Sequence, residues 1–256
     1  MSDIDGGREA ARGFHFQYVV SASRVLEMAY RNSRIGHVHV EQSGVANATV
    51  ADDQAVDLSV HSVDGQILSV VQIKSVANPE GSTVSAGRIL SIIESLARIP
   101  NAESYEYVTN AKLGPSGESL MALIIGGGRE LETEMDRLQI KVPHVRAAIR
   151  RGRFIQVSDA VTLRREFRFR LRDIRLAQRV GTGVDSSELL SAFIIDKVTQ
   201  AAAGLRGTEI DRETLRGWLS TKPAAIASAL GDYDWGNIVG TWPAPSTVLR
   251  EGVAVS

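Results

Sequence analysis

The chain of 256 residues contains no cysteine. That absence excludes disulfide bonds, thiolate zinc sites and cysteine nucleophiles together. Aromatic residues make up only 5% of the sequence, so aliphatic side chains must supply most of the core. No apolar run is long enough for a transmembrane helix, and residues 1–13 are too polar for a signal peptide. We therefore expect a cytoplasmic protein with no membrane partner.

Net charge is also nearly absent, at −1, but it is unevenly distributed. Residues 141–179 contain twelve basic and three acidic residues, a net charge of +9, which leaves −10 for the rest of the chain. Such asymmetry fits an anionic partner such as nucleic acid, and it also fits a solvated face that docks on acidic helices. In the first interpretation, the nucleic-acid-binding residues are Arg150, Arg151, Arg153, Arg168, Arg170 and Arg172.

Hydrophobic periodicity predicts a mixture of helices and strands. The expected helices are 8–31, 85–98, 118–125, 129–138, 143–151, 185–205 and 210–220. The expected strands are 37–42, 55–62, 66–76, 105–110 and, from period-two alternation, 166–176. This order predicts an α/β fold with a mixed sheet flanked by helices, followed by a mostly helical C-terminal part. We place the first domain at 1–180 and the helical extension at 181–256.

Helix ends carry their own signals. The GGG at 126–128 is expected to end the preceding helix, and it lacks the lysine and spacing of a phosphate-binding loop. Asp211 is expected to cap the helix at 210–220, and Asp185 or Ser186 is expected to cap the helix at 185–205.

The predicted hairpin at 55–76 places polar groups of three kinds near one end. Asp57 lies on the polar face of its first strand, and Gln72 and Lys74 share a face of the second. A carboxylate, an amide oxygen and an ammonium group can therefore converge. Metal-assisted phosphodiester hydrolysis requires such a set, with a hard cation bound by oxygen ligands and a lysine beside the developing negative charge.

Several motifs resemble those of one superfamily of nucleases. Asp57 followed by QIK (72–74) resembles the D…QxK variant of the PD-(D/E)xK signature. RGFHFQY (12–18) is similar to the helical opening motif of one branch of that superfamily, the dsDNA-nuclease domain of CBASS-associated endonucleases and related STAND-type anti-phage proteins. VTNAKLG (108–114) resembles a strand-end motif of that branch, and GTEIDRETLRGWL (207–219) is similar to the segment that follows its nuclease core.

The resemblance implies a restriction-endonuclease-like fold and a specific set of site residues. Asp57, Gln72 and Lys74 would be catalytic. Asp57, Glu41 and the main-chain carbonyl of Ile73 would bind Mg²⁺ or Mn²⁺. The supporting residues would be Gln17 and Glu27.

The same resemblance implies a biological role. The protein would be a metal-dependent endonuclease that cuts double-stranded DNA with little sequence specificity, as the effector of a bacterial anti-phage system. Such an effector must be held inactive in its own cell. The resemblance therefore also implies a sensor domain, a partner protein or activation by homo-oligomerisation.

Other interpretations of these residues remain open. Asp57 and Lys74 would also fit a cross-strand ion pair on a solvated face. Because Gln72 stands where many nucleases have an acid, the domain would also fit a catalytically silent nucleic-acid-binding or assembly module. A third alternative is a partner-binding domain that uses its helical C-terminus. His37 and His39 share a face with Glu41 and would suit zinc, but the sequence offers no evident fourth ligand.

Overall fold

The computed structural model describes residues 3–42, 56–177, 184–204, 207–222 and 225–226. Contacts divide the chain into two compact units, Met1–Ser220 and Thr221–Ser256. Every element named below belongs to the first unit. That unit includes the helices and the strand that follow the expected boundary at residue 180.

A six-stranded mixed sheet forms the centre of this unit, in the order β7-β5-β3-β2-β1-β8. In chain order, the strands are β1 (Ile35–Gln42), β2 (Val56–Ser62), β3 (Ile67–Lys74), β4 (Thr83–Val84), β5 (Ser104–Thr109), β6 (Lys112–Leu113), β7 (Gly152–Gln156) and β8 (Glu209–Asp211). β1, β2 and β3 pair antiparallel, whereas β3, β5 and β7 run parallel. β8 joins antiparallel to β1, and β4 and β6 form a small separate sheet.

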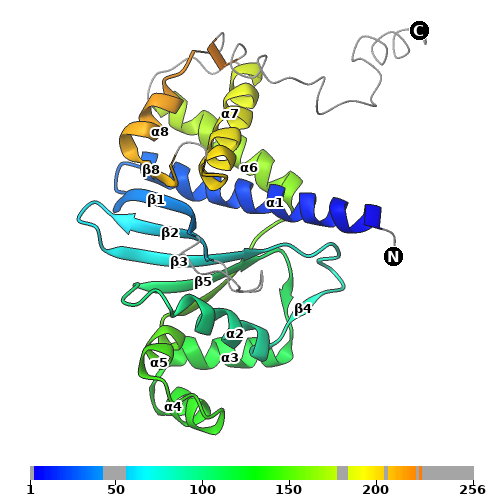
Figure 1. Cartoon of the computed structure of the whole chain (residues 1–256), viewed down its shortest axis with the longest axis vertical. Coiled ribbons are helices and arrows are strands. Elements are labelled where there is room, and N and C mark those ends of the chain that lie inside the picture. Colours follow the sequence, from blue (N-terminus) through cyan, green and yellow to red (C-terminus); the bar gives the residue numbers. More distant parts are fainter. Residues whose placement is uncertain (1–2, 43–55, 178–183, 205–206, 223–224, 227–256) are drawn as a thin grey trace. The chain divides into compact units, whose positions relative to one another are not determined.

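Helices cover both faces of the large sheet (Figure 1). In chain order, they are α1 (Asp3–Leu26), the 3-10 turn η1 (Glu27–Ala29), α2 (Ala86–Leu96), α3 (Pro115–Gly126), α4 (Gly128–Arg137), α5 (Pro143–Arg150), α6 (Ala160–Ala177), α7 (Val184–Ala202) and α8 (Arg212–Leu219). On one face α1 packs on the sheet and contacts α6 and α7. On the other face α2 packs on β3 and β5 and contacts α3 and α5. This arrangement confirms the predicted mixed sheet with helical cover.

Local sequence signals explain where several elements begin and end. The Asp211 side chain accepts a hydrogen bond from the Thr214 amide at 2.8 Å, which confirms it as the N-cap of α8. Gly127 has a φ of 61°, in the left-handed region that favours glycine, and α3 ends beside it as predicted. The predicted caps Asp185 and Ser186 lie where the structure describes no side chains.

Both faces of the β2–β3 hairpin are buried. Leu58 and Val60 are buried on one face of β2, and Asp57 and Ser59 are buried as well. The alternation predicted from the sequence is present, but the positions expected to be solvated are covered. A carboxylate at position 57 must therefore find its partners within the protein.

The prediction of a strand at 166–176 is wrong, because these residues lie in helix α6. Leu163, Phe167, Leu171 and Ile174 are buried at helical spacing, whereas Phe169 is half exposed. A strand would have placed Phe169 on the same face as Phe167. The edge strand β7 was not predicted. None of the helices in the described part of the chain is long and apolar enough to cross a membrane.

Candidate active site

The open end of the β2–β3 hairpin brings the predicted catalytic residues together. Leu58 pairs with Val71, so one further step along the antiparallel strands places Asp57 opposite Gln72. Lys74 lies two residues beyond Gln72, on the same face of β3, and ends that strand. The D…QxK motif is therefore one cluster in space.

Asp57 is held by hydrogen bonds from two directions. Its side chain is buried, with 6% relative exposure of the residue. Gln17 Nε2 donates to Asp57 Oδ1 at 2.9 Å, and the backbone amide of Ile73 donates to Oδ2. These donors offset the cost of burying the carboxylate and fix its orientation. Each oxygen of a carboxylate carries two lone pairs, so a hydrogen-bonded carboxylate can in general also ligate a cation.

Gln17 reaches Asp57 from helix α1, although 40 positions separate the two residues in the sequence. The structure therefore gives the glutamine of the RGFHFQY motif a specific contact, with the predicted metal-binding acid. The neighbouring Phe14 and Tyr18 stack on one another, with ring centroids 6.3 Å apart. The Gln17 hydrogen bond restricts the orientation of the Asp57 carboxylate.

The chain that leaves β3 is fixed by Asn110, within the VTNAKLG motif. The Asn110 amide oxygen accepts from the Val76 backbone amide at 2.8 Å, and its Nδ2 donates to the Val76 carbonyl at 3.0 Å. Two hydrogen bonds from one side chain hold the segment directly after Lys74. This asparagine therefore supports the end of the strand that carries Lys74.

The structure does not place the two other predicted acids, Glu41 and Glu27, in contact with Asp57 among the side chains that it describes. Glu41 has its backbone in β1, but its side chain is not among those the structure describes. Glu27 follows the end of α1, where Arg24 Nη1 donates to its carboxylate at 3.4 Å. Ten residues of helix correspond to about 15 Å, so Glu27 is far along α1 from Gln17. No described contact joins Glu27 to Asp57.

Glu106, a buried acid in β5, was not predicted as a site residue. Arg24 Nη2 forms an ion pair with Glu106 Oε2, and Ser104 Oγ donates to Oε1 at 3.0 Å. Glu106 has 4% relative exposure and lies within SYEYVT, a strand that is otherwise buried throughout. An acidic residue within an otherwise apolar or neutral strand is the sequence signal that could have identified Glu106. Arg24 links this acid to Glu27.

The basic segment is divided between the two faces of the sheet. Arg150 belongs to α5, which packs with α2, whereas Arg168, Arg170 and Arg172 belong to α6, which packs with α1 (Figure 1). Arg153 lies in the edge strand β7 between them. The arginines predicted to bind nucleic acid therefore do not form one continuous surface.

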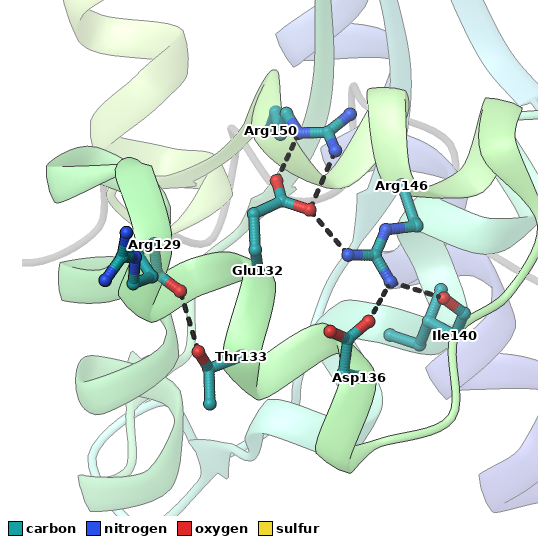
Figure 2. Close-up of polar contacts among 7 residues, drawn as sticks. All are labelled: Arg129, Glu132, Thr133, Asp136, Ile140, Arg146 and Arg150. Atoms are coloured by element: carbon teal, nitrogen blue, oxygen red, sulfur yellow. Dashed lines mark hydrogen bonds and ion pairs between the residues drawn. The ribbon is translucent and has the colours of Figure 1, made fainter.

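On the α5 side the arginines are engaged within the protein. Figure 2 shows the Glu132 carboxylate of α4 between Arg150 and Arg146. Arg150 Nε and Nη2 donate to Glu132 at 2.7 and 2.9 Å, and Arg146 also pairs with Asp136 at 2.6 Å. The hydrogen bonds from Arg150 and then Arg146 lower the pKa of Glu132 to about 2. Arg151 donates to the Ala102 carbonyl at 2.9 Å.

On the α6 side the arginines are less constrained. Arg168 pairs with Glu188 of α7 at 3.1 Å, and the Arg172 guanidinium lies 5.4 Å from the centre of the Phe169 ring. Arg170 lines a cavity of about 440 Å³ between α1 and α6, together with Arg24. Of the two groups, the α6 arginines are the better placed to contact an external anion.

Comparison with known proteins identifies the fold. No protein-family model and no curated protein sequence matches the chain. The Cap4 SAVED/CARF-domain containing receptor of Moraxella osloensis matches in structure with a TM-score of 0.50 and 11% identity, over 83% of this chain and 49% of that chain. The Acinetobacter baumannii Cap4 receptor with the cyclic trinucleotide 3'3'3'-cAAA matches with a TM-score of 0.50 and 14% identity, over 84% and 49%.

These likenesses concern the fold alone. The chain spans about half the length of the Cap4 receptors that it matches. The match covers more than four fifths of this chain, so it concerns the fold as a whole rather than a single supersecondary motif.

Proposed function

We propose that the chain is the nuclease part of a bacterial anti-phage effector, a metal-dependent DNA endonuclease of the PD-(D/E)xK superfamily with little sequence specificity. The observation that carries the proposal is the buried carboxylate of Asp57, fixed by Gln17 and the Ile73 amide directly opposite Gln72. A carboxylate held this firmly at a strand end, beside a lysine, suits a cation and the phosphodiester that the cation binds.

The donor set fits a hard divalent cation. Asp57 would hold Mg²⁺ or Mn²⁺ together with the main-chain carbonyl of Ile73, and Glu41 is the further acid proposed for the site. All of these ligands are oxygens, as Mg²⁺ prefers, and Mg²⁺ sites commonly use only one or two carboxylates with water and substrate phosphate completing the shell. The ion supplies an activated water and neutralises charge on the phosphate.

The protein residues around the cation would have separate roles in positioning and in charge stabilisation. Gln17 and the Ile73 amide keep Asp57 in one orientation. Gln72 presents an amide that can orient a water without adding charge. Lys74 places a positive charge where negative charge develops on the phosphate oxygens. Asn110 holds the chain that follows Lys74, so the strand end keeps its geometry.

The defence role rests on the fold of the neighbours together with the sequence motifs. The structural neighbours are Cap4 receptors, and the sequence motifs resemble those of CBASS-associated endonucleases. Since this chain spans about half of those receptors, a sensor region, a partner protein or homo-oligomerisation is proposed to supply the control. Double-stranded DNA is the proposed substrate, and the α6 arginines are proposed to contact its backbone.

A plasmid-cleavage assay tests the activity. The purified chain is incubated with supercoiled plasmid in Mg²⁺, in Mn²⁺ and in EDTA, alone and with a crosslinker that enforces oligomers. Nicked and linear products that require metal are expected. They should disappear in Lys74→Ala and persist in Lys112→Ala, a lysine change on the exposed β6 segment. Metal-independent cleavage, or full cleavage by Lys74→Ala, would contradict the proposal.

A catalytically silent nucleic-acid-binding module is the second candidate, and one observation favours it. Asp57 is the single carboxylate that the described side chains place at the hairpin end, because position 72 holds a neutral glutamine. Such a module would retain DNA in a salt-dependent way without metal and without any product. Gel retention measured in EDTA, beside the cleavage assay, separates the two candidates.

A further inference from the structure

Three histidines meet on the sheet, away from Asp57. His37 and His39 lie in β1, and His61 lies in the adjacent strand β2. One nitrogen from each ring lies within 4.8 Å of the other two. The ring centroids are 4.5 to 5.0 Å apart, with His37 stacked on His61 and His39 edge-on to both. Three of the five histidines of the chain are therefore in mutual contact.

The strand register creates this meeting. His37 pairs with His61 across the β1–β2 ladder, and His39 follows two residues later on the same face. The sequence suggested zinc at His37 and His39 together with Glu41, with no evident fourth ligand. His61 supplies a further imidazole from the neighbouring strand, 22 positions beyond His39. Ser59 Oγ lies 2.9 Å from His61 Nε2 and helps to orient that ring.

Stacked imidazoles favour their neutral form. Burial lowers the pKa of His39 and of His61, and the nearby histidine rings lower both further. Glu209 opposes this shift but does not reverse it. Neutral imidazoles carry the lone pairs that bind transition metals, so no proton has to be displaced near neutral pH.

We infer that His37, His39 and His61 form a binding site for Zn²⁺ or a similar divalent transition-metal ion. Tetrahedral zinc with nitrogen ligands at about 2.0–2.1 Å requires ligand atoms roughly 3.3 Å apart, so small side-chain rotations from the observed cluster would suffice. Glu209 in β8 provides the nearest carboxylate, with Oε2 3.8 Å from His39 Nε2. It can complete the coordination or hold a bound water.

This site differs from the proposed catalytic centre in place and in chemistry. His61 is four residues from Asp57 along β2, which corresponds to about 13 Å. Its donors are imidazole nitrogens, which suit zinc, copper and nickel, whereas the Asp57 centre offers oxygens, which suit Mg²⁺. An ion bound by the histidines would join β1 to β2 and, through Glu209, to β8. It would stabilise the edge of the sheet where the strand from the C-terminal half is added.

Direct metal binding tests the inference without any nuclease assay. Zn²⁺ affinity is measured by competition with a chromophoric chelator, and Co²⁺ is added separately to record its visible absorption. We expect one ion per chain and the strong absorption of tetrahedral Co²⁺. His61→Gln and His37→Gln should each weaken Zn²⁺ binding by roughly 100-fold or more. His144→Gln, on the exposed start of α5, should bind like the parent.

A further pair of measurements keeps the result interpretable. Asp57→Asn should leave Zn²⁺ affinity unchanged, so failure at the proposed catalytic centre and failure here are separable. Chemical shifts of the imidazole nitrogens, recorded by NMR on the parent chain with and without Zn²⁺, identify the ligands directly. This measurement needs no substitution, so it holds even where a histidine variant does not fold. The inference is overturned if the folded parent binds no Zn²⁺ at micromolar concentration, or if His37, His39 and His61 show no shift while Zn²⁺ binds elsewhere.

Discussion

The two ends of strand β2 hold different kinds of polar group, although the same alternation places both. Asp57 at one end is buried and accepts hydrogen bonds from Gln17 and from backbone. His61 at the other end is half-buried and contacts two further imidazoles. The first end offers oxygen to a hard cation and lies at an open strand end. The second offers nitrogen and lies within the paired sheet. Position along one strand thus separates a proposed reaction centre from a proposed structural metal.

The largest effect is expected from Asp57→Asn. The substitution keeps the shape of the side chain but removes the charge that would hold the cation, and it replaces one of the two acceptor oxygens with an NH2 group. Loss of several kcal/mol of metal-assisted stabilisation predicts a fall in plasmid cleavage of about a thousandfold. Asp64→Asn in the exposed hairpin turn is the matched control and should cleave like the parent. Equal cleavage by Asp57→Asn would place the reaction centre elsewhere.

A gain is expected from Gln72→Glu, which adds a second carboxylate opposite Asp57. Two buried like charges repel without a cation, so thermal stability in EDTA should fall, and Mg²⁺ should restore it. The Mg²⁺ concentration for half-maximal cleavage should drop by about tenfold. Gln66→Glu, at the exposed end of the hairpin, is the control for added charge. If Mg²⁺ restores neither stability nor cleavage, Gln72 does not adjoin a cation.

Gln17→Ala should have an intermediate effect. It removes the donor to Asp57 Oδ1 and leaves that oxygen without its 2.9 Å hydrogen bond. Losing one partner of a buried polar group costs about 1–3 kcal/mol, so cleavage at saturating Mg²⁺ should fall by roughly tenfold. Gln17→Glu, in contrast, should raise the metal requirement or abolish cleavage through repulsion. The matched control is Gln66→Ala, and an unchanged rate for Gln17→Ala would remove its positioning role.

The two groups of arginines are expected to differ in their effect on DNA retention, and this effect is smaller. Arg172→Ala in α6 should weaken DNA retention a few-fold and reduce the slope of log affinity against log salt by about one. Arg150→Ala should leave DNA retention unchanged, because this guanidinium already binds Glu132. Gel retention across a salt series checks both variants. An effect of Arg150→Ala as large as that of Arg172→Ala would reverse the assignment of faces.

The smallest expected effect is on the decrease in folding stability at acidic pH. The pKa values of His39 and His61 are lowered in the folded state from an ordinary value of 6.5. As the pH falls through that value, the unfolded chain takes up protons that the folded chain does not, so stability decreases. His61→Gln should flatten this decrease between about pH 7 and about pH 5, and His144→Gln should not. Melting temperatures measured in EDTA across this pH range report the decrease in stability. Identical pH profiles for His61→Gln and the parent chain would contradict the expectation.

The hairpin was predictable because its signals are local. Period-two alternation defines both strands, and Gly65 adopts the left-handed turn conformation that VDGQ suggests. The pairing of Asp57 with Gln72 follows from a short turn that fixes the register. Helix α6 was mistaken for a strand because Phe167 and Leu171 satisfy both periods, and only burial shows that Phe169 is excluded from the core.

The missed features depend on contacts between distant segments. β7 is only five residues long and is a strand because it pairs with β5. His61 joins His37 only once β1 and β2 pair, and the sequence does not give their register across residues 43–55. Glu132 and Arg150 are 18 positions apart and meet through the packing of α4 near α5. Charge counting alone could not show which arginines are already paired.

We propose that Asp57 is a cation ligand, and a crystal soaked in Mn²⁺ tests this role most directly. We expect an anomalous difference peak between the Asp57 carboxylate and the main-chain carbonyl of Ile73, at about 2.2 Å from the ligating oxygens. The peak should be lost in Asp57→Asn crystals. Anomalous density confined to the histidine cluster, or no ordered Mn²⁺ beside Asp57 at a concentration that supports cleavage, would contradict it.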